Sequence, residues 1–339
     1  MLRAPRAGGY SPRVSDDLEL PIEWSDVVAA RTRIAPHLTP TPLRHYPLLD
    51  AATGARVLVK HENHLPTNAF KARNALSLLT TLSIDQARRG VVAATRGNHG
   101  AGLAWAGARL GIPVVICVPL GNNVEKNAAI RGHGAELVEG GRDYDEAVEI
   151  AHRLAADRGL HMAHSTNDPA IIAGATTLSA EICEQAETLD AIVVAIGGGS
   201  QAVGAVIATR VLRPEVAVYG VQAAGASAIH DSWHARSRLS HPAAATFADG
   251  LATRSTYDLT WPTIRDGLAG FVAVSEPELA AAVRLFIVAT HNLVEGAGAA
   301  GLAGLLAMAP MFAGKTVAVI LSGSNIDTPT LTRILAHEI

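Results

Sequence analysis

Lys71 lies in a segment whose residue types and spacing could support covalent chemistry. Residues 66–71 (PTNAFK) indicate the start of a helix, because Thr67 or Asn68 is a suitable N-cap. Lys71 would then lie in the first turn, where the positive end of the helix dipole disfavours an ammonium group and lowers its pKa. Such an amine is a candidate nucleophile toward a carbonyl group. Most lysines are solvated surface residues, however, and for this segment alone that interpretation is the stronger one.

A glycine run at residues 197–201 (GGGSQ) follows the most apolar strand of the chain and opens a helix. Backbone N–H groups at such a turn, together with the helix N-terminus, make a good phosphate site. A dinucleotide site would need an acidic residue at the end of the next strand, but that strand ends at Gln222. The third glycine of the dinucleotide-binding motif G-x-G-x-x-G is also absent at its required spacing. The run therefore favours phosphate binding, with close helix–strand packing as the remaining interpretation.

Two further turns place polar side chains after expected strands. Residues 95–100 (TRGNHG) could direct backbone N–H groups at a carboxylate, or could form an ordinary turn with Asn98 as helix N-cap. For that turn the two interpretations are evenly matched. Ser322, in residues 321–325 (LSGSN), could present its hydroxyl to a ligand, although a plain turn is the stronger interpretation of that segment alone.

Short apolar runs alternate with helical stretches along most of the chain, which predicts an α/β protein with mostly parallel sheets. Residues 90–165 carry a βαβαβα pattern of their own and indicate a smaller inserted domain. We therefore divide the chain into an N-terminal arm (1–22), a large domain (23–88 and 166–339) and a small domain (89–165). The expected strands are 57–60, 91–95, 113–118, 135–138, 191–196, 216–221, 271–274 and 316–321, and the expected helices include 102–110, 123–131 and 144–157.

The composition excludes several classes of protein. Of 339 residues, 49% are hydrophobic and 17% are charged, so the chain can bury a substantial core and is not disordered. The net charge of −3 and the absence of a basic run argue against nucleic acid as a partner. No apolar run reaches membrane-spanning length, and the arm resembles no signal peptide. Cys117 and Cys183 are expected to be buried free thiols, which fits the cytoplasm.

Taken together and in their order along the chain, these four segments resemble the fold-type II pyridoxal-phosphate (PLP) enzymes. Within that group the chain is most similar to the serine/threonine dehydratase and serine racemase branch. The resemblance implies a tryptophan synthase β-like fold with two three-layer αβα domains and mostly parallel, twisted sheets. The family motifs Ser-Phe-Lys-x-Arg-Gly, Ser-Gly-Asn-His-Gly, tetraglycine and Ser-Gly-Gly-Asn match residues 69–74 (AFKARN), 96–100 (RGNHG), 197–200 (GGGS) and 322–325 (SGSN). Weaker matches lie at residues 40–43, 164–177, 248–250 and 295–298.

The resemblance also implies a role for each segment. Lys71 would hold PLP as a Schiff base and act as the catalytic base, and Phe70 would pack on one face of the ring. Asn98 would bind the ring's 3-oxygen, and Ser322 would face the ring nitrogen. The phosphate would be bound by Gly197, Gly198, Gly199, Ser200 and Gln201, and the substrate would be bound by Thr95, Arg96, Gly97, Asn98 and His99.

The activity implied is β-elimination, in which a β-hydroxy amino acid is dehydrated and deaminated to a 2-keto acid and ammonia. Candidate substrates are threonine, serine, hydroxyaspartate, phenylserine or a hydroxyectoine-derived diamino acid. Two alternatives remain, namely a β-replacement synthase of the cysteine-synthase type and a non-catalytic PLP-binding protein. The resemblance further suggests a homodimer.

Several residues depart from the family pattern. Arg96 replaces a serine that acts as the second acid/base in racemases, and arginine stays protonated, which argues against racemase activity. Arg96 would pair with a second acidic group on the substrate or, slightly favoured, turn outward or pair with a protein carboxylate. Asn68 and Asn74 replace glycines, which would add bulk near the substrate entrance. Gln222 and Ala228 stand where the family has carboxylate ligands for a divalent cation, so that metal site is expected to be missing.

Overall fold

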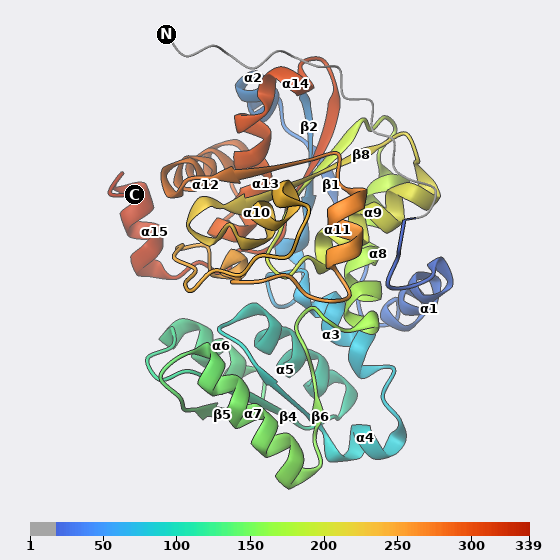
Figure 1. The fold of residues 1–339 in the computed structure, drawn as a ribbon, viewed down its shortest axis with the longest axis vertical. Coiled ribbons are helices and arrows are strands. Elements are labelled where there is room, and N and C mark those ends of the chain that lie inside the picture. Colours follow the sequence, from blue (N-terminus) through green and yellow to red (C-terminus); the bar gives the residue numbers. More distant parts are fainter. Residues whose placement is uncertain (1–17) are drawn as a thin grey trace.

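The computed structural model describes residues 18–339, so most of the predicted arm lies outside the described residues. Two sheets form two lobes, one above the other in Figure 1. The larger lobe has a six-stranded sheet with the order β1-β2-β10-β7-β8-β9, in which only β1 is antiparallel to its neighbour. Its strands are β1 (Leu43–His45), β2 (Arg56–His61), β7 (Ala191–Ala195), β8 (Ala217–Ala223), β9 (Gly270–Val274) and β10 (Thr316–Leu321).

Helices cover both faces of this large sheet because its strands are apolar on both sides. In β7, Val193 packs toward one face whereas Ile192 and Val194 pack toward the other. The first face is covered by α2 (Pro47–Thr53), α12 (Glu276–Thr290), α13 (Gly296–Ala307), α14 (Ala309–Phe312) and α15 (Thr328–Leu335). The second is covered by α1 (Trp24–Ile34), α8 (Pro169–Gln185), α9 (Ser200–Leu212), α10 (Ala228–Ala235) and α11 (Trp261–Gly267).

The smaller lobe repeats this architecture on a four-stranded, fully parallel sheet with the order β5-β4-β3-β6. Its strands are β3 (Val91–Ala94), β4 (Val114–Val118), β5 (Glu136–Glu139) and β6 (His161–Met162). One face packs on α3 (Lys71–Leu79), α4 (Ile84–Arg89), α5 (Asn98–Leu110) and α6 (Val124–Gly132), and the other packs on α7 (Tyr144–Arg158). Both lobes are therefore three-layer αβα units, and the predicted fold class is confirmed.

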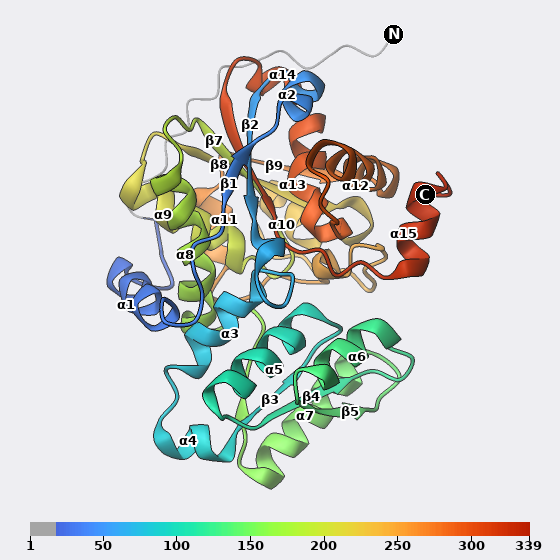
Figure 2. The same cartoon turned by 180° about the vertical axis from the view of Figure 1, so that it is seen from behind.

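Helix α3 lies where the two lobes meet, as Figure 2 shows from behind. Its apolar residues, including Leu76 and Leu79, belong to the core of the small sheet, although they precede the expected boundary at residue 88. The same helix also packs against α8 of the large lobe. All four strands of the small sheet lie within residues 91–162, but the domain boundaries themselves stay a prediction because α3 is shared.

The predicted strands and helices all form, with ends that differ by a few residues. The short strands β1 and β6 were not predicted, because three and two residues carry too little periodicity. Cys117 and Cys183 are buried free thiols, as expected. Among residues 18–339 no helix is both long enough and apolar enough to cross a membrane.

Candidate active site

A cavity of about 430 Å³ lies where the carboxyl ends of β3, β7 and β10 meet the start of α3. Ligands of open α/β sheets bind at this edge, because the turns after parallel strands converge there. The cavity brings together all the side chains and glycines predicted to form the site. They are Phe70, Lys71, Thr95, Arg96, Gly97, Asn98, His99, Gly197, Gly198, Gly199, Ser200, Gln201 and Ser322.

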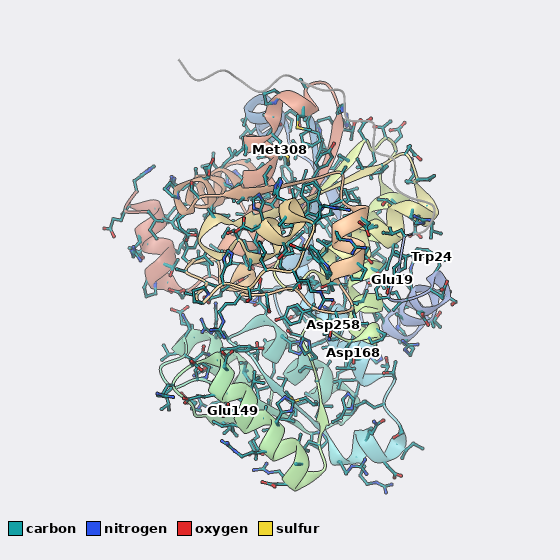
Figure 3. The ribbon with its side chains drawn as sticks, viewed as in Figure 1. Glu19, Trp24, Glu149, Asp168, Asp258 and Met308 are labelled. Carbon is teal, nitrogen blue, oxygen red and sulfur yellow. The ribbon has the colours of Figure 1, made fainter. Side chains whose placement is uncertain are left out.

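Lys71 lies in the first turn of α3, as expected, and is the first residue of that helix. Its Nζ donates a hydrogen bond to the carbonyl of Ser165 at 2.8 Å and lies 5.0 Å from the centre of the Phe70 ring. Ser165 belongs to the loop that leads to Asp168, the N-cap of α8 (Figure 3). Burial lowers the pKa of Lys71 to about 8, so the amine loses its proton at a lower pH than an ordinary lysine does.

The N-cap expected at Thr67 or Asn68 is wrong, because the helix begins later and Phe70 precedes it. Asn68 instead adopts a left-handed backbone with φ of 54°, which asparagine tolerates better than most residues. The expectation that Asn74 adds bulk near the substrate entrance is also wrong. Asn74 is fully buried in α3. It packs closely against Gly174 of α8, because a Cβ added to that glycine would lie only 2.9 Å from the Cα of Asn74.

Arg73 anchors the helix that carries Lys71. It is almost fully buried and forms ion pairs with Glu62 at 2.7 Å and with Glu181 at 2.6 Å. Lys60 Nζ completes this cluster with a 2.6 Å contact to Glu181. Sequence reasoning missed the cluster, since its members come from distant segments and only Arg73 stood in a quoted motif.

Replacing Arg73 with methionine should lower the free energy of unfolding by about 3–5 kcal/mol, because two buried carboxylates lose their main cation. Urea unfolding followed by circular dichroism would measure the loss. The matched control is Arg31→Met, since Arg31 pairs with Glu184 at 2.5 Å but on the surface, where about 1 kcal/mol or less is expected. Equal losses for the two variants would show that the buried cluster does not stabilise the fold.

Three backbone and side-chain hydrogen bonds fix the segment after β10 against the segment before Lys71. Phe70 N donates to Ser322 O at 3.0 Å, and Ser324 N donates to Asn68 O at 2.9 Å. Asn325 Nδ2 adds a third bond, to the carbonyl of Thr67, also at 2.9 Å. The position of Ser322 relative to Lys71 is therefore determined by the fold, although the two residues are far apart in the sequence.

The glycine turn exposes its donors toward the cavity. The carbonyls of Gly197 and Gly198 accept hydrogen bonds from Thr253 at 3.2 Å and from Thr260 at 2.9 Å. By contrast, the backbone N–H groups of residues 197–201 donate to no acceptor within residues 18–339. Helix α9 begins at the end of this turn, so its positive dipole end adds to these free donors. Such a nest of N–H groups is suited to a phosphate.

Asn98 is held at both ends of its amide, and it begins α5 rather than capping it. Its Nδ2 donates to Glu295 at 2.6 Å, and its Oδ1 accepts from Asn325 at 2.7 Å. Burial raises the pKa of Glu295, against the attraction of Lys126. Glu295 and Asn325 both stood in matched motifs, but the sequence assigned neither of them a role.

The turn after β3 contributes a buried, neutral histidine and an exposed arginine to the cavity. His99 is buried, and burial lowers its pKa to about 3, so its imidazole is neutral. Its Nε2 lies 3.2 Å from the carbonyl of Ala163, which can only accept, so Nε2 carries the proton. Arg96 is exposed on the cavity wall, and no carboxylate of residues 18–339 forms an ion pair with it.

Two ion pairs that the sequence did not predict join the lobes across the cavity. Lys126 of α6 contacts Asp249 at 2.5 Å, and Arg254 contacts Asp145 at the start of α7. Asp249 opens the 3₁₀ helix η3 (Asp249–Leu251) of the large lobe. Asp249 lay in a quoted motif, but Arg254 and Asp145 carried no sequence signal, because their pairing depends on how the lobes meet.

Gln222, one of the two residues that stand where the family has a carboxylate ligand for a cation, makes other contacts. The side chain of Gln222 donates to Thr253 at 3.2 Å and accepts from the backbone N–H of His230 at 2.9 Å. Within the described part of the chain, no three histidine, cysteine or carboxylate side chains are grouped as a metal would require.

Comparison with known proteins agrees with this geometry. Residues 34–323 match the family described as "Pyridoxal-phosphate dependent enzyme". An L-threonine ammonia-lyase of Thermotoga maritima is 34% identical over 93% of this chain and 78% of its own length. An L-threo-3-hydroxyaspartate ammonia-lyase of a Pseudomonas species is 34% identical over 92% of this chain and 98% of its own length.

A solved structure extends the likeness to three dimensions. A threonine deaminase from the organism abbreviated T.th. has a TM-score of 0.85 and 35% identity, covering 89% of this chain and 98% of that one. The names of these relatives support the predicted reaction class, PLP-dependent β-elimination with release of ammonia. The cofactor predicted from the four segments is also confirmed. The chain belongs to the family of pyridoxal-phosphate dependent enzymes.

Proposed function

We propose that this chain dehydrates and deaminates a β-hydroxy amino acid whose side chain ends in an anionic group, such as 3-hydroxyaspartate. The observation that carries the proposal is Arg96, a cation on the cavity wall without a carboxylate partner among residues 18–339. The other cations that line the cavity, apart from Lys71, are engaged with Asp249 or Asp145. The Pseudomonas relative named for L-threo-3-hydroxyaspartate lends further support.

The residues present fit the cofactor. A free nest of N–H groups at residues 197–201 suits its phosphate, and the amine of Lys71 suits its aldehyde. Phe70 would pack against the ring, Asn98 would donate to its oxygen, and Ser322 would face its nitrogen. When bound, PLP supplies an electron sink that makes the Cα proton of an amino acid acidic.

The chain's own residues divide the remaining work. Lys71 Nζ, with a pKa near 8, would accept the Cα proton as a general base. The backbone N–H groups of Asn98 and His99 would bind the α-carboxylate, because the N–H of Gly97 already donates to Thr95 Oγ1 at 3.1 Å. Arg96 would hold the distal carboxylate, which orients Cα toward Lys71. Ser322 would offer the ring nitrogen only a neutral hydroxyl, which cannot stabilise a fully protonated ring.

The Arg96 assignment predicts a selective loss of activity. The Arg96→Gln variant should lower kcat/KM for 3-hydroxyaspartate by about 10- to 100-fold, because a charge-assisted hydrogen bond contributes about 1.5–3 kcal/mol. Activity on threonine should change by no more than about twofold. Keto-acid formation from both substrates would be measured, with Arg131→Gln as control, since Arg131 pairs with Glu139 outside the cavity. Equal losses on both substrates, or a wild-type preference for threonine, would contradict the proposed substrate class.

The pKa of Lys71 predicts how cofactor loading depends on pH. Only the neutral amine attacks an aldehyde, so the rate of PLP attachment to the apo-protein should rise about tenfold per pH unit below pH 8 and level off above it. Stopped-flow absorbance would record this rate between pH 6 and pH 10. A rate that still rises steeply above pH 9 would show that the amine keeps an ordinary lysine pKa.

Two expectations from the sequence remain proposals. A homodimer would appear in size-exclusion chromatography with light scattering as twice the mass of one chain, and a monomeric mass would exclude it. A cytoplasmic location rests on the two free cysteines alone.

A further inference from the structure

Three side chains from distant segments form a continuous chain of hydrogen bonds behind the cavity. Asn325, after β10, donates through Nδ2 to Asn98 Oδ1 at 2.7 Å. Asn98, at the start of α5, donates through Nδ2 to Glu295 Oε1 at 2.6 Å. Glu295 is buried directly before α13, and its oxygen lies 2.4 Å from the position that a Cβ on Gly323 would take. The chain of bonds is therefore enclosed tightly by the segment that contains Asn325.

The direction of each amide in this chain can be deduced. Asn325 Nδ2 also donates to the carbonyl of Thr67 at 2.9 Å, and a carbonyl oxygen can only accept. The nitrogen of Asn325 must therefore face Thr67, and its second hydrogen points to Asn98. Asn98 must then turn its oxygen to Asn325 and its nitrogen to Glu295.

This arrangement leaves one N–H group of the Asn98 amide without an acceptor among the described residues. An amide nitrogen carries two hydrogens, and Glu295 takes one from Asn98. Asn98 lines the cavity, so the second hydrogen is available to a ligand there. Donation from Asn325 into Asn98 Oδ1 polarises the same amide and strengthens its remaining N–H donor.

We propose that Asn325 is a positioning residue that fixes the amide of Asn98 so that its free N–H meets the ring oxygen of the cofactor. This inference rests on the proposed placement of that oxygen beside Asn98. Asn325 itself lies outside the main cavity and acts only through Asn98.

The Asn325→Asp variant tests the proposal with almost no change of shape. An aspartate has no N–H for Thr67 or Asn98, so Asn98 is expected to turn its nitrogen toward the new carboxylate and lose its donor in the cavity. The matched control is Asn292→Asp, because Asn292 Nδ2 also donates to a carbonyl, that of Thr290 at 2.7 Å, away from the cavity. Asn325→Ala removes the same donor without adding charge and serves if the aspartate variant does not fold.

Equilibrium binding to the apo-protein would use two probes, PLP and 3-deoxypyridoxal 5′-phosphate, which lacks the ring oxygen. We expect Asn325→Asp to raise the Kd of PLP about tenfold, the loss of one good hydrogen bond, and to leave the Kd of the deoxy probe within about twofold. Asn292→Asp should change neither value. In an Asn98→Ala background, Asn325→Asp should have no further effect on PLP.

Equal weakening of both probes by Asn325→Asp would overturn the proposal, because it would indicate general damage to the site. Unchanged binding of PLP in that variant would overturn it as well, and so would additive effects of the two substitutions. These measurements follow cofactor binding alone, so a failure of the proposed substrate class would appear separately, in the keto-acid assay.

Discussion

Replacing Lys71 with alanine is expected to abolish keto-acid formation, with kcat falling by at least about 10³-fold. The variant removes both the amine that holds the cofactor and the general base, and a positioned base alone contributes about 10²–10⁴-fold. The fold should survive, because within residues 18–339 the side chain of Lys71 makes a single hydrogen bond, to the carbonyl of Ser165. Activity and thermal unfolding would be measured on the same preparation.

Lys315→Ala is the matched control for this variant. Lys315 lies over the ring of Phe312, in the large lobe and outside the cavity, so its removal should leave kcat unchanged within about twofold. Substantial activity of Lys71→Ala with any one substrate would contradict the proposed chemistry, whatever the substrate class.

The glycine turn should be nearly as sensitive to one added methyl group. A Cβ at Gly198 would lie 2.2 Å from the hydroxyl of Thr166, which is itself buried. The turn must therefore move, and the N–H donors of residues 197–201 would lose their common focus. Because hydrogen bonds to a charged group contribute about 1.5–3 kcal/mol each, Gly198→Ala should raise the Kd of PLP by about 10- to 100-fold or more.

Gly132→Ala is a suitable comparison for that variant. Gly132 ends α6, and a Cβ there would have no neighbour within 4 Å, so cofactor binding should not change. Titration of each apo-protein with PLP would give both dissociation constants. Unaltered binding by Gly198→Ala would place the phosphate somewhere other than this turn.

The sequence predicted one common site through the family resemblance of the four segments, and parallel topology explains part of their convergence. Gly197 and Ser322 follow the neighbouring parallel strands β7 and β10, whose carboxyl ends lie at one edge of the large sheet, whereas Thr95 follows β3 of the small sheet. The alternation of strands and helices predicted the parallel sheets, but the meeting of the two sheets at one cavity did not follow from local pattern. The glycine run by itself favoured a phosphate, whereas the carbonyl cofactor was implied by the family resemblance of the ordered motifs.

The parts that the sequence could not predict depend on contacts between distant segments. The start of α3 was misplaced because Ala69 bridges to Gly323 and Asn68 adopts a left-handed backbone. The pairing of Arg254 with Asp145 requires the two lobes to meet, and no local pattern encodes that distance. Asn74 appeared to lie at the entrance because it is close to Lys71 in sequence, yet helical geometry turns it toward α8.

Reduction of the cofactor-loaded protein with borohydride, followed by peptide mapping, tests the central claim most directly. The chain contains four lysines, namely Lys60, Lys71, Lys126 and Lys315, so the labelled position can be assigned without ambiguity. We expect one pyridoxyl group per chain on the peptide that contains Lys71. A label on any of the other three lysines, or no label in protein that has bound PLP, would contradict this account.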